Sequence, residues 1–327
     1  GRSMFVDGGL NFLILDAKTG KKLKEIVMDD KKPGTDKDLQ LQHEVLSMPQ
    51  ALNDLLTFDG KEIHMRKQDF DLEGNRLELK NSTPFYAKFT GKDKPNEVYK
   101  KKKGNPHIIS GTGFLDDSWW HRTYWTFGEN YISGHMGYYV SGKEYPSGRI
   151  MSFGDDGVTA WGRMTQYYRW SKEYEYYLFN RSYENKENWG VRVPILVRSM
   201  TRAKNKLFIF GPEELLNQKK SKNILDQPAT QKTVQAQDDA YHGKSGALLL
   251  AIDPQNGQMT EGYKLHTTPV FDGMVNAYNK LYISMSDGSV ICLGGEGRDN
   301  EALKAELIET YNANAKVVGP KPRKKRK

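Results

Sequence analysis

Short apolar runs rich in β-branched and aromatic residues follow one another along the chain, separated by turn residues. Runs at 10–15 and 23–28 flank the segment 16–20, Asp-Ala-Lys-Thr-Gly. In such a segment the Asp16 side chain can accept backbone N–H groups, and Gly20 can adopt a positive φ. Strand-length runs between turns are typical of β-structure. The pattern therefore predicts an all-β protein.

Asp-Gly pairs between apolar runs mark further turns. Asp-Gly is a strong signal for a two-residue β-hairpin, because both residues accept the positive φ that this turn requires. Hairpins that follow one another in sequence predict antiparallel meanders. The predicted hairpin turns are Asp59-Gly60, Asp156-Gly157, Asp272-Gly273 and Asp287-Gly288.

The sequence contains an internal repeat. Residues 12–20 (FLILDAKTG) are echoed by residues 249–257 (LLAIDPQNG). The segment from Gly246 to Gly294 then predicts four strands and three turns, which matches the roughly 45 residues of one propeller blade. We therefore expect a β-propeller of four-stranded antiparallel blades that is N-terminally truncated or otherwise incomplete.

The repeated strand–Asp-x-x-Thr/Asn-Gly–strand unit resembles the pyrroloquinoline-quinone (PQQ) repeat of quinoprotein-dehydrogenase-like propellers. The strand pair at 281–293 (LYISMSDGSVICL) and the segment 112–125 (TGFLDDSWWHRTYW) share the resemblance. The resemblance covers about half the chain, and the segment 112–125 is similar to one in large bacterial PQQ-binding-like propeller proteins of undefined activity. It implies a propeller fold and a periplasmic or otherwise extracytoplasmic location, and it carries little information about chemistry.

In quinoprotein dehydrogenases the family implies PQQ beneath a disulfide between adjacent cysteines, a calcium ion and an aspartate base. Cys292 is the only cysteine here, so that disulfide cannot form. The family's tryptophan, four residues after the turn glycine, is replaced by Lys24 and Glu261. We therefore expect no PQQ or calcium, and no inter-blade tryptophan contact from these two repeats.

Composition suggests the following organisation. Residues 1–297 should form the propeller blades, with polar insertions at about 29–53 and 212–243. Within 298–318, Asn300 can cap a helix with apolar residues on one side. The basic segment 319–327 is expected to be a disordered tail.

Net charge and hydropathy limit the classes of partner. The chain has a formal charge of +8, but the tail supplies six of these charges, which leaves +2 for the rest. Specific nucleic-acid binding is therefore not expected.

No apolar run approaches the roughly 18 residues that cross a bilayer, so we expect no membrane span. No signal peptide precedes the first strand, and we expect the chain to begin inside a longer protein.

The densest group of functional side chains lies at 116–125. Aromatic rings can stack on sugars, while carboxylates and arginine can bind hydroxyl or anionic groups. The structural alternative is that the tryptophans fill space between blades. The candidate binding residues are Asp116, Asp117, Trp119, Trp120, His121, Arg122, Tyr124 and Trp125.

The seven histidines show no HExxH or other close metal-ligand spacing, so the sequence predicts no metal site, although distant histidines could still assemble one. A second aromatic stretch, at 167–170 and 174–179, is expected to face the core, with a ligand-contacting loop as the alternative.

The leading functional hypothesis is a non-catalytic scaffold that binds a protein or polysaccharide on a propeller face. One alternative is a polysaccharide lyase in which His121 or Tyr124 is the base and Arg122 neutralises a uronate. A degenerate quinoprotein dehydrogenase is the other.

Overall fold

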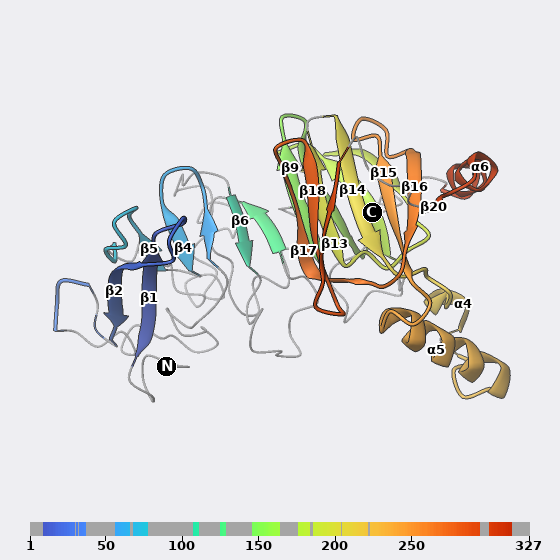
Figure 1. Ribbon diagram of the computed structural model, residues 1–327, viewed down its shortest axis with the longest axis horizontal. Helices are drawn as coiled ribbons and strands as arrows, with labels where there is room; N and C mark the ends of the chain where they lie inside the picture. The colour runs from blue at the N-terminus through green and yellow to red at the C-terminus, as the bar shows by residue number, and fades with distance from the viewer. Residues whose placement is uncertain are drawn as a thin grey trace, which may run out of the picture. The chain divides into compact units, whose positions relative to one another are not determined.

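The computed structural model describes residues 9–29, 31, 33–36, 56–65, 68–77, 107–110, 125–128, 146–163, 176–183, 186–203, 205–221, 223–294 and 301–315. The chain divides into two compact units, Gly1–Ser147 and Gly148–Lys327, which are described here one at a time. The described residues of both contain antiparallel strands (Figure 1). The all-β prediction is therefore confirmed at the level of a mostly β chain.

The first unit contains small antiparallel sheets. One is a hairpin and two are three-stranded, with the last strand, β8, at the boundary of the unit. The strands are β1 (Leu10–Leu15) with β2 (Lys22–Met28), β3 (Thr57–Phe58) with β4 (Ile63–Met65) and β5 (Gln68–Phe70), and β6 (His107–Ser110) with β7 (Trp125–Gly128) and β8 (Ser147–Gly148).

The predicted turn between β1 and β2 is confirmed. One carboxylate oxygen of Asp16 accepts the backbone N–H groups of Lys18 (3.1 Å) and Thr19 (2.8 Å). Gly20 has φ +69°, a backbone conformation that residues other than glycine adopt at an energetic cost. The hairpin packs on β5, where the rings of Phe12 and Phe70 stack with centroids 4.4 Å apart. Both rings belong to a cluster of buried apolar residues among the described residues of the first unit.

The described residues of the second unit form three antiparallel sheets, each a meander apart from the edge strand β20, which follows the third sheet in the chain. The first sheet has four strands, the second has four long strands and one short edge strand, and the third has three. The first sheet is β9 (Ile150–Gly154), β10 (Gly157–Arg163), β11 (Tyr176–Arg181) and β12 (Glu187–Val191). The second is β13 (Ser199–Ala203), β14 (Lys206–Gly211), β15 (Ala247–Ile252), β16 (Met259–Leu265) and β20 (Glu301–Ala302), and the third is β17 (Pro269–Ala277), β18 (Lys280–Met285) and β19 (Val290–Leu293).

These three sheets stack face to face, with the second in the middle. Successive side chains of a strand point to opposite faces. On β15, Leu248 and Leu250 join a core cluster with residues of the first sheet, while Leu249 joins a cluster with residues of the third. All six residues of β15 are buried for this reason. Each buried leucine contributes about 1.5–3 kcal/mol, so both interfaces stabilise the stack.

The first strands of the three sheets lie next to one another. β13 contacts β9 on one side and β17 on the other. The Asn276 side chain on β17 donates to Thr201 Oγ1 (2.9 Å) and to the carbonyl oxygen of Arg202 (2.7 Å), both on β13. None of the described sheets closes on itself, so the described residues establish stacked antiparallel meanders, and the propeller stays a prediction.

The predicted single blade from Gly246 to Gly294 is wrong in its boundaries. β15 and β16 belong to the second sheet, where β15 pairs with β14, and β17 to β19 form a separate sheet. The repeat itself is real, because Asp253 and Gly257 repeat the hydrogen bonds of the first turn and Gly257 has φ +76°. The blade boundaries were predicted wrongly because β15 pairs with β14, from which it is separated in the chain by the long insertion at 212–243.

The predicted hairpin turn at Asp272-Gly273 is also wrong. Both residues lie inside β17, where the register with β18 shifts between Pro269 and Met274. Asp272 has φ +55°, as expected for an irregularity in a strand. The chain instead reverses at Tyr278-Asn279, with φ +51° and +58°. Asp59-Gly60 and Asp287-Gly288 do lie in turns between adjacent strands, whereas the β9–β10 turn is Asp155-Asp156 and Gly157 is already the first residue of β10.

The predicted polar insertion at 212–243 lies between β14 and β15. It contains two helices, α4 (Gln218–Ser221) and α5 (Pro228–Tyr241). The side chain of Gln237 anchors α5, since its Oε1 accepts the N–H of Leu215 (2.7 Å) and its Nε2 donates to the Glu213 carbonyl (3.0 Å).

The C-terminal helix falls inside the predicted range. α6 (Ala305–Asn314) packs Ile308 and Tyr311 on the core between the first and second sheets. The Asn312 side chain accepts the N–H of Met259 and donates to its carbonyl, both at 2.9 Å. This paired contact fixes α6 to the first residue of β16. The predicted insertion at 29–53 lies largely outside the described residues, and the predicted tail lies wholly outside them.

Candidate functional site

The segment 116–125 is described only at its last residue. Trp125 begins β7, pairs with Ser110 of β6 and is 8% exposed. An indole so deeply buried contributes to the interior and not to an open binding surface. The remaining predicted site residues lie outside the described part of the chain: Asp116, Asp117, Trp119, Trp120, His121, Arg122 and Tyr124.

The second aromatic stretch faces the core, as predicted, over its described residues. Tyr177 and Phe179 are buried, with ring centroids 4.9 Å apart. On the other face of β11, Tyr176 stacks on Trp161 of β10 at 4.5 Å. These rings fill both faces of the first sheet.

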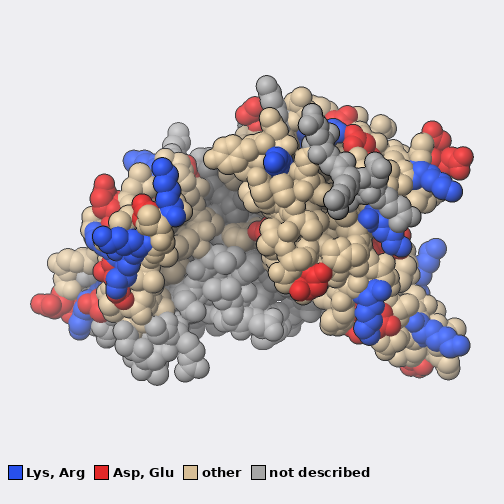
Figure 2. Space-filling view, in the orientation of Figure 1, with Lys and Arg blue, Asp and Glu red and all other residues tan. Residues whose placement is uncertain are grey.

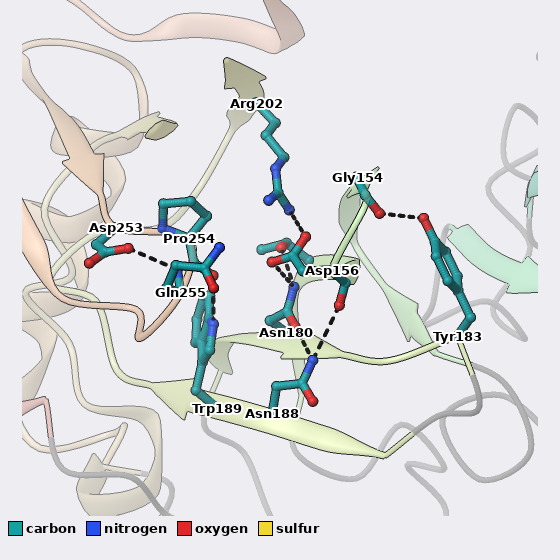
Figure 3. A network of polar contacts seen from close by, with 11 residues as sticks. Gly154, Asp156, Asn180, Tyr183, Asn188, Trp189, Arg202, Asp253, Pro254 and Gln255 are labelled. Atoms are coloured by element: carbon teal, nitrogen blue, oxygen red, sulfur yellow. Dashed lines mark hydrogen bonds and ion pairs between the residues drawn. The ribbon is translucent and has the colours of Figure 1, made fainter. Parts of the chain in front are cut away.

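A polar network joins the first and second sheets (Figure 3). Asp156 stands in the turn between β9 and β10, and its Oδ1 lies 2.5 Å from Nη1 of Arg202 on β13. Both side chains are largely buried, at 23% and 13% exposed. Gly154 leaves room for the guanidinium, because a Cβ there would lie 2.8 Å from Arg202 Cζ. The ion pair therefore depends on a glycine as well as on the two charges.

Two asparagines position Asp156. The Nδ2 of Asn180 donates to Thr159 Oγ1 (3.0 Å) and, at 3.4 Å, to Asp156 Oδ2. Asn188 Nδ2 donates to Asn180 Oδ1 (2.6 Å) and to the Asp156 carbonyl (3.3 Å). Tyr183 adds a hydrogen bond from its hydroxyl to the Gly154 carbonyl. Burial is the main cause that raises the pKa of Tyr183, so this hydroxyl remains a donor at neutral pH.

Trp189 makes the second junction between these sheets. Its indole Nε1–H donates to the Pro254 carbonyl at 2.8 Å. The ring lies against Gly257, where a Cβ would come within 2.6 Å of Trp189 Cε3. This contact joins β12 of the first sheet to the β15–β16 turn of the second (Figure 3).

Sequence analysis missed this tryptophan contact. Lys24 and Glu261 do occupy the two positions where tryptophan was expected, and Glu261 instead pairs with Lys206. Trp189 comes from a third strand–turn–strand unit, β11–β12, whose turn lacks the Asp-x-x-Thr/Asn-Gly pattern. The signal available was a tryptophan soon after a polar turn.

A candidate metal centre lies in the first unit. His64 on β4 stands opposite Asp69 on β5, and its Nδ1 is 2.7 Å from Asp69 Oδ1. Its Nε2 is 3.3 Å from Oδ2 of Asp59, which lies in the β3–β4 turn. One ligand atom each from Glu62, His64 and Asp69 lie within 4.8 Å of one another. Among the described residues this is the one such group of potential metal ligands.

Hydrogen bonds fix the protonation of this cluster. Burial acts to raise the pKa of Asp59, but the N–H groups of Glu62 and Lys61 and the nearby His64 hold it at about 2. Burial acts in the opposite sense on His64 and lowers its pKa, yet the hydrogen bond and charge of Asp69, together with Asp59, raise it above the ordinary value. The ring is thus held between two carboxylates.

Two other described histidines are at the surface. His242 Nδ1 lies 3.5 Å from Asp238, and His266 Nε2 lies 2.8 Å from Asp287. Hydrogen bonds from Ser289 and then His266 hold the pKa of Asp287 at about 2. Each histidine pairs with one carboxylate in these contacts, so neither resembles the buried cluster around His64.

The charged surface shows no single-sign field on the face in Figure 2, where the Lys and Arg side chains of described residues are interspersed with Asp and Glu. Within the described ranges, no helix has the length and apolar character needed to cross a membrane. A scan against protein-family models and a search of curated proteins each found no match.

Proposed function

We propose that this chain is a non-catalytic, propeller-type scaffold that binds a protein or polysaccharide partner outside the cytoplasm. Three observations in the second unit support the propeller assignment: consecutive meanders, face-to-face stacking and adjacent first strands. The shared turn geometry at Asp16 and Asp253 supports the PQQ-repeat resemblance. The extracytoplasmic location follows from that resemblance alone.

The scaffold role is supported by one observation, which is that the polar residues at the junction of the first two sheets bind one another. Asp156, Arg202, Asn180 and Asn188 contact one another across or within the sheets. Such groups rigidify a frame, and recognition then falls to loops and turns at its surface.

Tyr278 is our candidate contact residue at such a turn. It is 92% exposed, and its φ of +51° is unusual for a bulky aromatic residue. An exposed ring at a strained turn is typical of a residue kept for binding and not for stability. The ring can stack on a sugar or pack on an apolar side chain.

We predict that Tyr278→Asn raises the free energy of unfolding by about 0.5–1 kcal/mol while weakening partner binding. Asparagine adopts positive φ more readily than tyrosine, so the turn is relieved of strain. The measurements are urea unfolding and binding of the full chain to polysaccharide arrays and to extracts of its native organism.

Asn279→Gly is the matched control. It relieves the same turn, since Asn279 has φ +58°, but keeps the Tyr278 ring. We expect this variant to be stabilised and to retain binding. Equal binding by both variants would remove Tyr278 from the contact surface, and turnover of a small substrate without any reproducible partner would contradict the scaffold function.

We also predict that PQQ with calcium produces no saturable change in tryptophan fluorescence or melting temperature. The sole cysteine, Cys292, is exposed and cannot form the family's disulfide over the cofactor. A saturable response at micromolar PQQ would favour the degenerate quinoprotein instead.

A further inference from the structure

We propose that Glu62, His64 and Asp69 bind one divalent transition-metal ion, and that zinc is the ion their chemistry fits. One imidazole and two carboxylates are ligands that zinc accepts in proteins, with a water molecule completing the coordination. The three ligand atoms are already within 4.8 Å of one another. This site belongs to the first unit and does not depend on the proposed scaffold function.

The backbone places these ligands without any long excursion of the chain. His64 and Asp69 are directly opposed residues of the antiparallel pair β4–β5, and Glu62 immediately precedes that hairpin. Opposed residues have side chains on the same face of a sheet. The strand pairing therefore holds two ligands together before any metal arrives.

Asp59 acts as the outer carboxylate that orients the histidine. Its Oδ2 faces His64 Nε2 at 3.3 Å, while its Oδ1 accepts the backbone N–H groups of Lys61 (2.8 Å) and Glu62 (2.7 Å). A metal-binding histidine usually donates its second ring N–H to such a carboxylate. When zinc displaces the proton that Nδ1 shares with Asp69, the remaining proton on Nε2 faces Asp59 and the Nδ1 lone pair faces the metal.

Burial makes the arrangement more than a surface ion pair. The side chains of His64 and Asp59 are 8% and 4% exposed, and that of Asp69 is 13% exposed. The side chains are thus held in place, and ligands held in place need little reorganisation on binding.

Only a small movement is needed to admit the ion. Two ligands at about 2.0–2.1 Å from a tetrahedral zinc are about 3.3 Å apart. The present Nδ1–Oδ1 separation is 2.7 Å, so these two atoms must move slightly apart to admit the ion. Zinc would take the position of the shared proton, and binding would release that proton to solvent.

The test is a zinc titration of the full chain by calorimetry in two buffers of different ionisation enthalpy. We expect one zinc per chain with proton release, and no competition from excess magnesium, which prefers all-oxygen octahedral sites. Glu62→Gln and His64→Asn should each weaken binding at least tenfold. Asp59→Asn should weaken it about tenfold through the orientation of His64.

His266→Asn is the matched control, because it removes a histidine–aspartate pair at the surface. It should leave the affinity unchanged. Far-UV circular dichroism identifies any variant that fails to fold, and Glu62→Gln, at a ligand that is only partly buried, keeps the test decisive if His64→Asn unfolds. Absence of saturable zinc binding, or unchanged affinity in a folded Glu62→Gln variant, would overturn the proposal.

Discussion

Replacing Trp189 with alanine is expected to lower the free energy of unfolding of the second unit by about 3–5 kcal/mol. The indole is 6% exposed and lies in the core between the first and second sheets. Its removal leaves a cavity and also leaves the Pro254 carbonyl without its 2.8 Å donor. Urea unfolding followed by circular dichroism measures the loss.

Gly257→Ala tests the same contact from the other side. A methyl group there meets both the cost of φ +76° and the Trp189 ring, whereas the methyl of Gly288→Ala, at φ +87°, meets no atom within 4 Å. We expect Gly257→Ala to cost about 1–3 kcal/mol more than Gly288→Ala because of overpacking. In a Trp189→Ala background the two glycine substitutions should cost the same. If the difference persists, Trp189 is not the residue that packs on this turn.

The second large effect concerns the charge pair between the first two sheets. Arg202→Met should cost about 2–3 kcal/mol, because Asp156 then keeps its charge in a largely buried position. This loss of unfolding free energy is smaller than that expected for a fully buried ion pair, because both side chains are partly exposed. The measurement is the urea midpoint at neutral pH.

The double variant Asp156→Asn with Arg202→Met separates pairing from packing. It removes both charges, so we expect it to be more stable than Arg202→Met alone. Lys206→Met, which removes the more exposed pair with Glu261, should cost less than about 1 kcal/mol. If Arg202→Met, the double variant and Lys206→Met all lose the same free energy of unfolding, the Asp156 charge is solvated and the pairing argument is wrong.

Local turn chemistry was the most predictable part of this structure. The Asp16–Gly20 turn, and the turns that contain Asp59-Gly60 and Asp287-Gly288, follow from side-chain hydrogen bonding and positive φ within a few residues. The limits of the apolar runs similarly predicted β1 and β2. Turns that depend on hydrogen bonds between residues close in sequence can be predicted from the local sequence.

Long-range pairing was not predictable in the same way. The partner of β14 is β15, beyond an excursion that contains α5, and no local pattern reports that choice. At Asp272-Gly273 pairing with β18 overrode the local turn signal and produced a bulge.

The candidate sites were also hard to predict, because they depend on contacts between strands and sheets and not on local sequence. His64 and Asp69 form a cluster because β4 pairs with β5, not because their spacing is a known metal motif. Trp189 was missed because its contact with Gly257 depends on how two sheets stack.

Native-state hydrogen exchange of the full chain tests most directly our central claim, that the three sheets of the second unit form one stacked frame. We predict that the amides of β10, β14, β15 and β18 exchange slowest and share one opening free energy, because the stacked sheets share two cores. Trp189→Ala should lower that free energy in all three sheets together. Fast, independent exchange of β18, or a Trp189→Ala effect confined to the first sheet, would contradict the stacked frame.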